Sequence, residues 1–131
     1  MILVDSSVWI DFLRAKNTPQ VVRFEQLVRQ QRLCVGDLVL AEVLQGIPAD
    51  RDFSEAQELM TRFPVLTIGG EQVALEAARN YRTLRAKGIT VRKTIDTLIA
   101  TRCIMDGHAL LFSDRDFDPF VEHLGLVDAM G

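Results

Sequence analysis

The stretch TIDTLIATRCIMDGHALLFSD, residues 94–114, decides the fold class because it joins one helix directly to one buried strand. Its first part carries apolar residues at helical spacing, with Thr94 as the expected N-cap, and runs until Gly107, a residue type that commonly ends helices. The run ALLFS at 109–113 is short and almost wholly apolar, which is typical of a strand buried on both faces. Such strands occur where helices cover both faces of a parallel sheet, so the stretch predicts an α/β domain.

The same alternation of strands and helices extends outward along the chain. Short apolar strands are predicted at residues 2–5, 33–35, 65–68, 109–113 and 126–127. Helices are predicted between them, at residues 6–15, about 22–29, 38–45, about 52–63, 72–87 and 95–106, with a short one after 114. Ser6 or Ser7 is the expected N-cap of the first helix. With 131 residues, 48% of them hydrophobic, we expect residues 1–131 to form one small three-layer α/β/α domain with a mostly parallel sheet.

Composition and cysteine spacing exclude several classes of protein. No apolar run approaches the ~18 residues that a membrane span requires, so no membrane association is expected. Cys34 and Cys103 lie far apart, and no paired CxxC element occurs, so neither a zinc site nor a disulfide framework is indicated. We expect two reduced, buried thiols in a cytoplasmic protein.

The basic residues are concentrated in one part of an acidic chain. The net charge is −3, yet six of the fifteen Lys and Arg residues lie between Ala77 and Ile95, where no acid occurs. Such a stretch is either the solvated face of a helix or a surface that binds phosphate groups. Taken alone, the stretch favours the solvated face.

Several carboxylates interrupt the apolar pattern where a core would be expected. Asp5 and Asp114 each follow a buried strand, and Glu42 and Asp96 lie among apolar residues of their helices. Ligand sites in open α/β sheets form at the carboxyl ends of the strands, where these acids could converge. The structural alternatives are helix-dipole pairing for Asp5 and Asp96, turn formation for Asp114 and Asp116, and an ion pair with Arg92 or Arg102 for Glu42.

Converging carboxylates without histidine or cysteine are ligands for Mg²⁺ or Mn²⁺, and with a basic surface nearby they indicate phosphoryl-transfer chemistry. Two other acidic sites of α/β proteins fit less well. A phosphatase with an aspartyl nucleophile needs a second acid two residues after Asp5, where Ser7 stands. A phosphoacceptor signalling domain needs a lysine at a late strand end, which none of Lys16, Lys87 and Lys93 occupies.

Three segments together resemble the successive signature blocks of the PIN-domain ribonucleases, more narrowly the VapC-like toxins of bacterial type II toxin–antitoxin modules. They are LVDSSVWIDFL at 3–13, LVLAEVLQG at 38–46 and TIDTLIATRCIMDGHALLFSDRDF at 94–117. The resemblance covers the whole chain in order and spacing. It implies Mg²⁺- or Mn²⁺-dependent endonucleolytic cleavage of RNA. The implied catalytic and metal-binding acids are Asp5, Glu42, Asp96 and Asp114, with Asp116 adjoining them and Ser7 as a partner of the first acid. In the last block either aspartate could be the nearer ligand, and we favour Asp114.

The resemblance also implies a reaction and partners. Hydrolysis of structured cellular RNA by metal-activated water would leave 5′-phosphate and 3′-hydroxyl ends. Candidates for holding the flanking phosphates are Arg82, Arg85, Arg92 and Lys93. VapC-like toxins form homodimers, and a cognate antitoxin blocks them by filling an apolar groove. Part of the first helix could line that groove, or its large side chains Val8, Trp9, Phe12 and Leu13 could all be core. The alternative function is a catalytically silent PIN-like module that acts through its protein partner, and it would be expected to lack one of the four acids.

Overall fold

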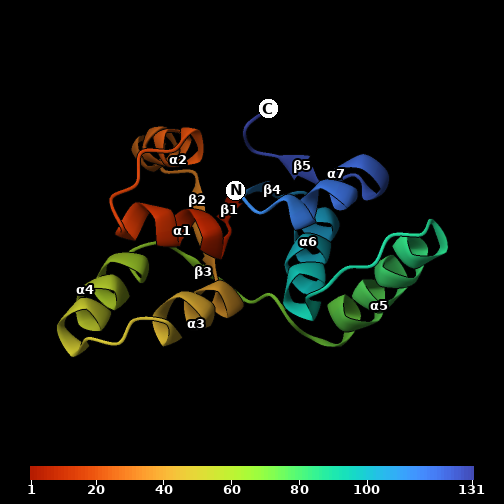
Figure 1. Cartoon of the computed structure of the whole chain (residues 1–131), viewed down its shortest axis with the longest axis horizontal. Coiled ribbons are helices and arrows are strands. Elements are labelled where there is room, and N and C mark those ends of the chain that lie inside the picture. The colour runs from red at the N-terminus through yellow and green to blue at the C-terminus, as the bar shows by residue number, and fades with distance from the viewer.

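The computed structural model describes residues 1–131 and contains one five-stranded, wholly parallel sheet with helices on both sides (Figure 1). The strands follow the spatial order β3-β2-β1-β4-β5. Their bounds are β1 Ile2–Val4, β2 Leu33–Gly36, β3 Val65–Leu66, β4 Ala109–Leu111 and β5 Val127–Asp128. The predicted three-layer α/β/α architecture and the parallel sheet are confirmed.

The helices form two groups, and in Figure 1 the first four lie on one side of the strands and the later ones on the other. The first group is α1 Ser6–Leu13, α2 Pro19–Arg29, α3 Asp37–Gln45 and α4 Asp50–Met60. The second group is α5 Glu71–Ala86, α6 Thr94–Asp106, the single 3₁₀ turn η1 Arg115–Phe117 and α7 Asp118–Leu124. No helix is both long enough and apolar enough to cross a membrane.

The central strand explains why the sheet has no polar face. All three residues of β1 are buried, and β1 pairs in parallel with β2 on one side and β4 on the other. A strand covered by helices on both faces must be apolar throughout instead of alternating, and Ile2–Val4 meets that requirement. The outermost strands have only two residues each, which leaves little exposed edge.

The core on the side of the first helical group is built around Trp9. Its ring is fully buried and packs edge-on against Phe24 and Phe63, with ring centroids 5.0 Å and 5.6 Å away. Truncation of such a residue to alanine costs about 3–5 kcal/mol. Val8 is fully buried as well, so both residues belong to the core.

Two helix N-caps differ from the sequence prediction, and α2 and α4 begin two to three residues earlier than predicted, at Pro19 and Asp50. Asp5, not a serine, is the N-cap of α1, and its carboxylate accepts a hydrogen bond from the Ser7 amide (3.2 Å). Lys93 is the N-cap residue of α6 and makes no side-chain capping bond, while Thr94 is already the first helical residue. An N-cap requires extended backbone angles, which Asp5 and Lys93 have because each follows directly from a strand or loop.

Both cysteines are free and buried, as expected. Burial raises the pKa of the Cys103 thiol to about 12 and raises the pKa of Cys34 as well. Both thiols therefore stay protonated at neutral pH and behave as small apolar groups.

The pairing of the strands brings distant parts of the chain to one edge of the sheet. Val4 at the end of β1 lies opposite Leu111 at the end of β4, and the Asp5 amide donates to the Leu111 carbonyl (2.9 Å). At the end of β2, the backbone of Gly36 lies so close to Ile68 that a β-carbon at position 36 would be 2.9 Å from the Ile68 side chain. The residues that follow these three strands consequently gather at a common edge.

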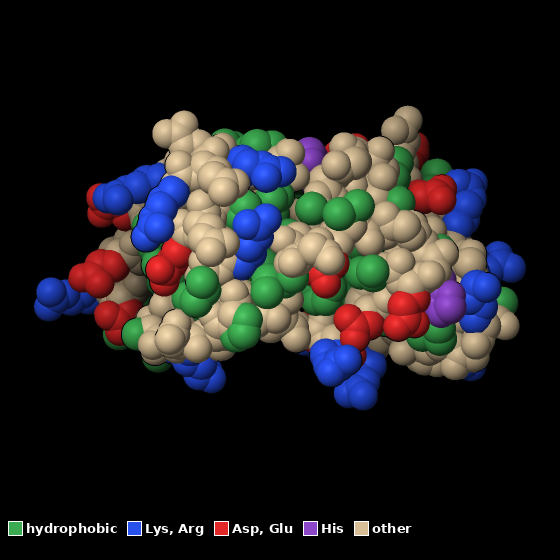
Figure 2. Space-filling view, turned by 90° about the horizontal axis from the view of Figure 1, so that it is seen from above, with side chains coloured by type: hydrophobic (Ala, Val, Ile, Leu, Met, Phe, Trp, Pro, Cys, Tyr) green, Lys and Arg blue, Asp and Glu red, His purple; other side chains and the backbone are tan.

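The outer surface carries charges of both signs. On the face shown in Figure 2, Lys and Arg side chains project around the rim and are interspersed with acidic ones, with no wide field of a single sign. Any site with a strong charge of one sign on this face is therefore a small cluster of residues.

Candidate metal centre

The four predicted acids meet in one cavity at the carboxyl edge of the sheet. The cavity has a volume of about 200 Å³. It is lined by Asp5, Ser6, Ser7, Ile10, Glu42, Lys93, Asp96 and Asp114. Since the acids come from the end of β1, the middle of α3, the first turn of α6 and the loop after β4, only the tertiary fold brings them together.

Asp5 is fixed in place by Ser7. The Ser7 hydroxyl donates to Asp5 Oδ2 (2.7 Å), and it accepts a hydrogen bond from the amide of Ser113 (3.2 Å). Ser7 thus ties the acid after β1 to the loop after β4. Burial raises the pKa of Asp5, the hydrogen bonds from Ser7 oppose that rise, and the charge of Glu42 adds to it.

Glu42 is held by a residue that the sequence did not single out. Its Oε1 atom accepts a hydrogen bond from the Ser6 hydroxyl at 2.7 Å. The ion pair with Arg92 or Arg102, the structural alternative for Glu42, is not formed. Arg102 instead donates to the backbone carbonyls at 68 and 69 and pairs with Asp106.

Asp96 has the environment that most clearly requires a cation. The residue is 4% exposed, and its Oδ2 atom is buried without a hydrogen-bond partner. Burial, with a further contribution from the charge of Asp5, raises the pKa of Asp96 to about 7, while Lys93 acts in the opposite direction. An unpartnered buried carboxylate oxygen is costly, and a bound divalent cation would satisfy it. The residues present therefore fit a hard, oxygen-seeking metal ion.

Asp114 and Asp116 are both near this point, in different ways. Asp114 lines the cavity, and its Oδ1 atom accepts a hydrogen bond from the Asp116 amide (2.9 Å), which caps η1. Asp96, Asp114 and Asp116 each offer one carboxylate oxygen, and these three atoms lie within 4.8 Å of one another. Asp114 lines the cavity and Asp116 does not, although both belong to this group of three acids.

The predicted RNA-binding residues do not all come together. Lys93 is the only basic residue that lines the acidic cavity. Arg82, Arg85 and Arg92 are exposed but lie outside it, and Arg85 donates to the Thr90 hydroxyl (3.1 Å). Lys93 is thus the one basic side chain at the cavity. Arg82 and Arg85 lie on α5, and Arg92 lies in the loop that follows it.

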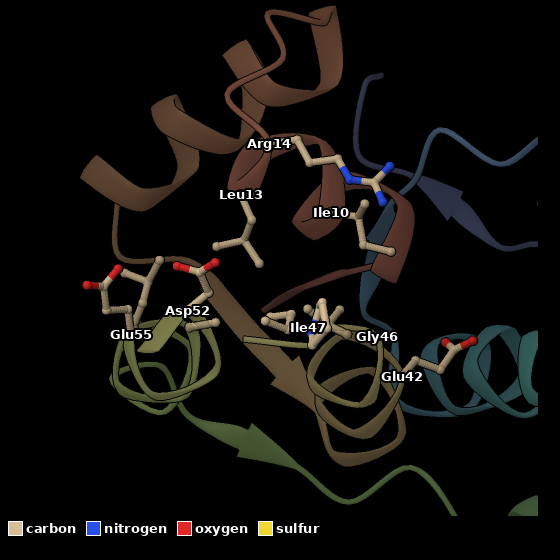
Figure 3. A pocket seen from close by; sticks show the side chains of 12 residues that line it. Ile10, Leu13, Arg14, Glu42, Gly46, Ile47, Asp52 and Glu55 are labelled. Atoms are coloured by element: carbon tan, nitrogen blue, oxygen red, sulfur yellow. The ribbon is translucent and has the colours of Figure 1, made fainter. Parts of the chain in front are cut away.

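A larger groove of about 510 Å³ adjoins the cavity, between α1, α3 and α4 (Figure 3). Of the four large side chains considered for such a groove, only Leu13 lines it, because Val8 and Trp9 are buried and Phe12 stacks on Phe24. Apolar lining comes from Ile10, Leu13, Val43, Ile47, Pro48, Ala56 and Leu59, and charged lining from Arg14, Glu42, Asp52 and Glu55. Ile10 and Glu42 border both the groove and the acidic cavity.

Comparison with known proteins agrees with the fold. The profile of the PIN-domain family matches residues 2–121. The VapC ribonuclease Mb1587 of Mycobacterium bovis is 31% identical over 120 residues, which cover 90% of each chain.

Solved structures share the fold at low sequence identity. VapBC2 from Rickettsia felis, bound to a DNA fragment from its promoter, superposes with a TM-score of 0.74 at 17% identity and covers 97% of this chain and 96% of that one. A toxin–antitoxin complex from Klebsiella pneumoniae gives 0.69 at 15% identity and covers 98% of both chains.

Proposed function

This chain belongs to the PIN-domain family, and from that premise we propose that its acidic cavity is the active site of a divalent-metal endoribonuclease. The proposal rests on one observation above all. Asp5, Glu42, Asp96 and Asp114 line a single cavity, and within it Asp96 carries a buried oxygen without a partner. A relative 31% identical to this chain is named a VapC ribonuclease, which supports RNA as the substrate.

Mg²⁺, or Mn²⁺ in its place, is the cation we propose for this cavity, held mainly by Asp5 and Asp96 with Glu42, Asp114 and Asp116 nearby. When bound, such an ion lowers the pKa of water and neutralises charge on phosphoryl oxygens. The protein contributes the positions of the ligands. Ser7 fixes Asp5 through its hydroxyl, and capping of η1 orients Asp114.

Binding of the RNA chain is proposed to use the basic residues near the cavity. Lys93 faces the acids and can hold a phosphate at the mouth of the cavity. Arg82, Arg85 and Arg92 are exposed and can contact flanking phosphates, which position a nucleic acid without reading its bases. Structured cellular RNA is the proposed target.

Regulation by an antitoxin is proposed to use the groove beside α1. The groove has an apolar floor with Ile10 and Leu13, and the acids Asp52 and Glu55 also line it. These features suit a partner segment that carries apolar and basic side chains. A solved structure of this fold is a toxin–antitoxin complex, which supports a partner of this kind. A homodimer and a cytoplasmic location remain predictions, the first tested by sedimentation at micromolar concentration.

One experiment tests the proposed activity directly. Purified protein is incubated with structured RNA in Mg²⁺ or in EDTA, and cleavage with 5′-phosphate ends is expected only in Mg²⁺. Asp5→Asn removes a charged ligand and should abolish cleavage. Asp106→Asn, which removes an acid at the far end of α6, should leave cleavage intact. Wild-type cleavage by Asp5→Asn, with contaminating nuclease excluded, would contradict the assignment.

A further inference from the structure

A serine at the start of α1 makes a contact for which the family resemblance gave it no role. The Ser6 hydroxyl donates to Glu42 Oε1 at 2.7 Å and joins the first turn of α1 to the middle of α3. Ser6 is 8% exposed, so water competes little for this hydrogen bond. Hydrogen bonds to a carboxylate at this length are among the stronger ones in proteins.

Glu42 needs such a restraint because its side chain borders two hollows of the protein surface. It borders the acidic cavity at one side and the larger groove at the other. In Figure 3 its carboxylate extends away from the other labelled groove residues, toward the second group of helices. A glutamate side chain has several rotatable bonds, and ordering it costs up to about 2 kcal/mol.

The neighbouring acids add a repulsion that favours the other orientation. Glu42 shares the cavity with Asp5, Asp96 and Asp114, and its negative charge acts on both Asp5 and Asp96. Like charges in a confined space repel one another, so the acids of the cavity oppose the inward orientation of a flexible carboxylate. The Ser6 hydroxyl is the one side-chain hydrogen-bond donor to Glu42, and it holds the carboxylate against that repulsion.

We propose that Ser6 is a positioning residue that keeps the Glu42 carboxylate aimed into the acidic cavity, where it completes the cation site. This inference rests on the proposed metal-dependent function of the cavity. The role differs from that of Ser7, whose hydroxyl bonds to Asp5. Ser6 acts on the cation only through Glu42, so its effect must disappear when the carboxylate of Glu42 is removed.

The test is a calorimetric titration of the purified protein with Mg²⁺. Loss of a residue that orients a metal ligand typically weakens metal affinity 10- to 100-fold, and we expect about tenfold for Ser6→Ala. Ser6→Thr keeps the hydroxyl and should bind Mg²⁺ within about twofold of wild type, well below the 10- to 100-fold loss typical of a removed orienting group. The control Thr61→Ala removes a hydroxyl that donates to the Gln57 carbonyl on α4 and should leave the affinity unchanged.

A double-mutant cycle separates orientation from general damage. In a Glu42→Ala background, Ser6→Ala should cause no further loss of Mg²⁺ affinity. Melting curves in EDTA establish that each variant is folded, and Ser6→Cys, a weak donor of similar size, provides the same test if the alanine variant does not fold.

Two results would overturn this inference without overturning the proposed function. One is wild-type Mg²⁺ affinity in Ser6→Ala, and the other is an equal loss of Mg²⁺ affinity from Ser6→Ala with and without the Glu42 carboxylate. Failure of the wild-type protein to bind Mg²⁺ would overturn the proposed function and this inference together.

Discussion

Replacement of Asp96 by asparagine removes one negative charge from the cavity at nearly constant shape, and we expect it to stabilise the metal-free protein. The pKa of Asp96 rises from 3.8 to about 7 on folding, which corresponds to roughly 4 kcal/mol of destabilisation by the ionised form near neutral pH. Screening by solvent reduces this figure to about half. Loss of an acid from the first turn of α6 costs about 0.3–1 kcal/mol.

The net gain for Asp96→Asn in the absence of metal is therefore about 1–2 kcal/mol in the free energy of unfolding. No hydrogen bond is lost at Oδ2, because that atom has no partner in the wild-type protein. For a domain of 131 residues the gain corresponds to a rise in melting temperature of roughly 4–8 °C.

The assay is a set of thermal melts of both proteins near neutral pH, in EDTA and in millimolar Mg²⁺. Mg²⁺ should raise the melting temperature of wild type by linkage and raise that of Asp96→Asn much less. Asp106→Asn is the matched control, because Asp106 pairs with Arg102 at the other end of α6 and its loss should destabilise slightly. A lower melting temperature of Asp96→Asn in EDTA, with the Mg²⁺ effect intact, would refute a shared cation site.

Three further predictions follow from the same geometry. Folding raises the pKa of Asp96 and of Asp5, so the folded state binds more protons than the unfolded state between about pH 4 and pH 7, and the stability of the metal-free protein should fall as pH rises through that window. Urea melts that show stability rising with pH would contradict the burial of these acids. Arg82→Ala combined with Arg85→Ala should reduce the slope of the logarithm of the RNA-binding constant against the logarithm of salt concentration by about 0.7 per lost phosphate contact to single-stranded RNA, with Mg²⁺ affinity unchanged. An unaltered slope would show that this segment is a solvated helix face. Leu13→Asp places a charge in the apolar groove, so an antitoxin encoded directly upstream should no longer relieve growth inhibition by this variant, while the variant still cleaves RNA. If the antitoxin still neutralises the variant, the groove is not the docking site.

The fold and the four acids were predictable because each leaves a local signal. Buried parallel strands produce continuous apolar runs, and a carboxylate that interrupts such a run stands out whatever its partner is. Asp5 and Asp114 follow strands directly, so their convergence required only the rule that parallel strands end at one edge of the sheet.

Other parts of the site depend on contacts between distant segments that have no local signal. A serine at position 6 matches an ordinary helix cap, and its actual partner lies 36 residues away on α3. The alternative of an ion pair between Glu42 and Arg102 does not occur, because Arg102 is engaged by carbonyls of the segment before α5. Arg82 and Arg85 lie on α5 and Arg92 lies in the loop that follows it, whereas Lys93, at the start of α6, lines the acidic cavity.

The pairing of β1 with β4 has a consequence for synthesis on the ribosome. β1 consists of residues 2–4, whereas its neighbour β4 spans residues 109–111, so residues 5–108 are synthesised between the two paired strands. Such distant pairing carries a large loop-closure cost and forms late. A nascent chain that has not yet released β4 also lacks Asp114 and has no place to order Asp96 against Asp5. The acidic cavity is consequently assembled only after β4 and the residues up to Asp114 have been synthesised and released.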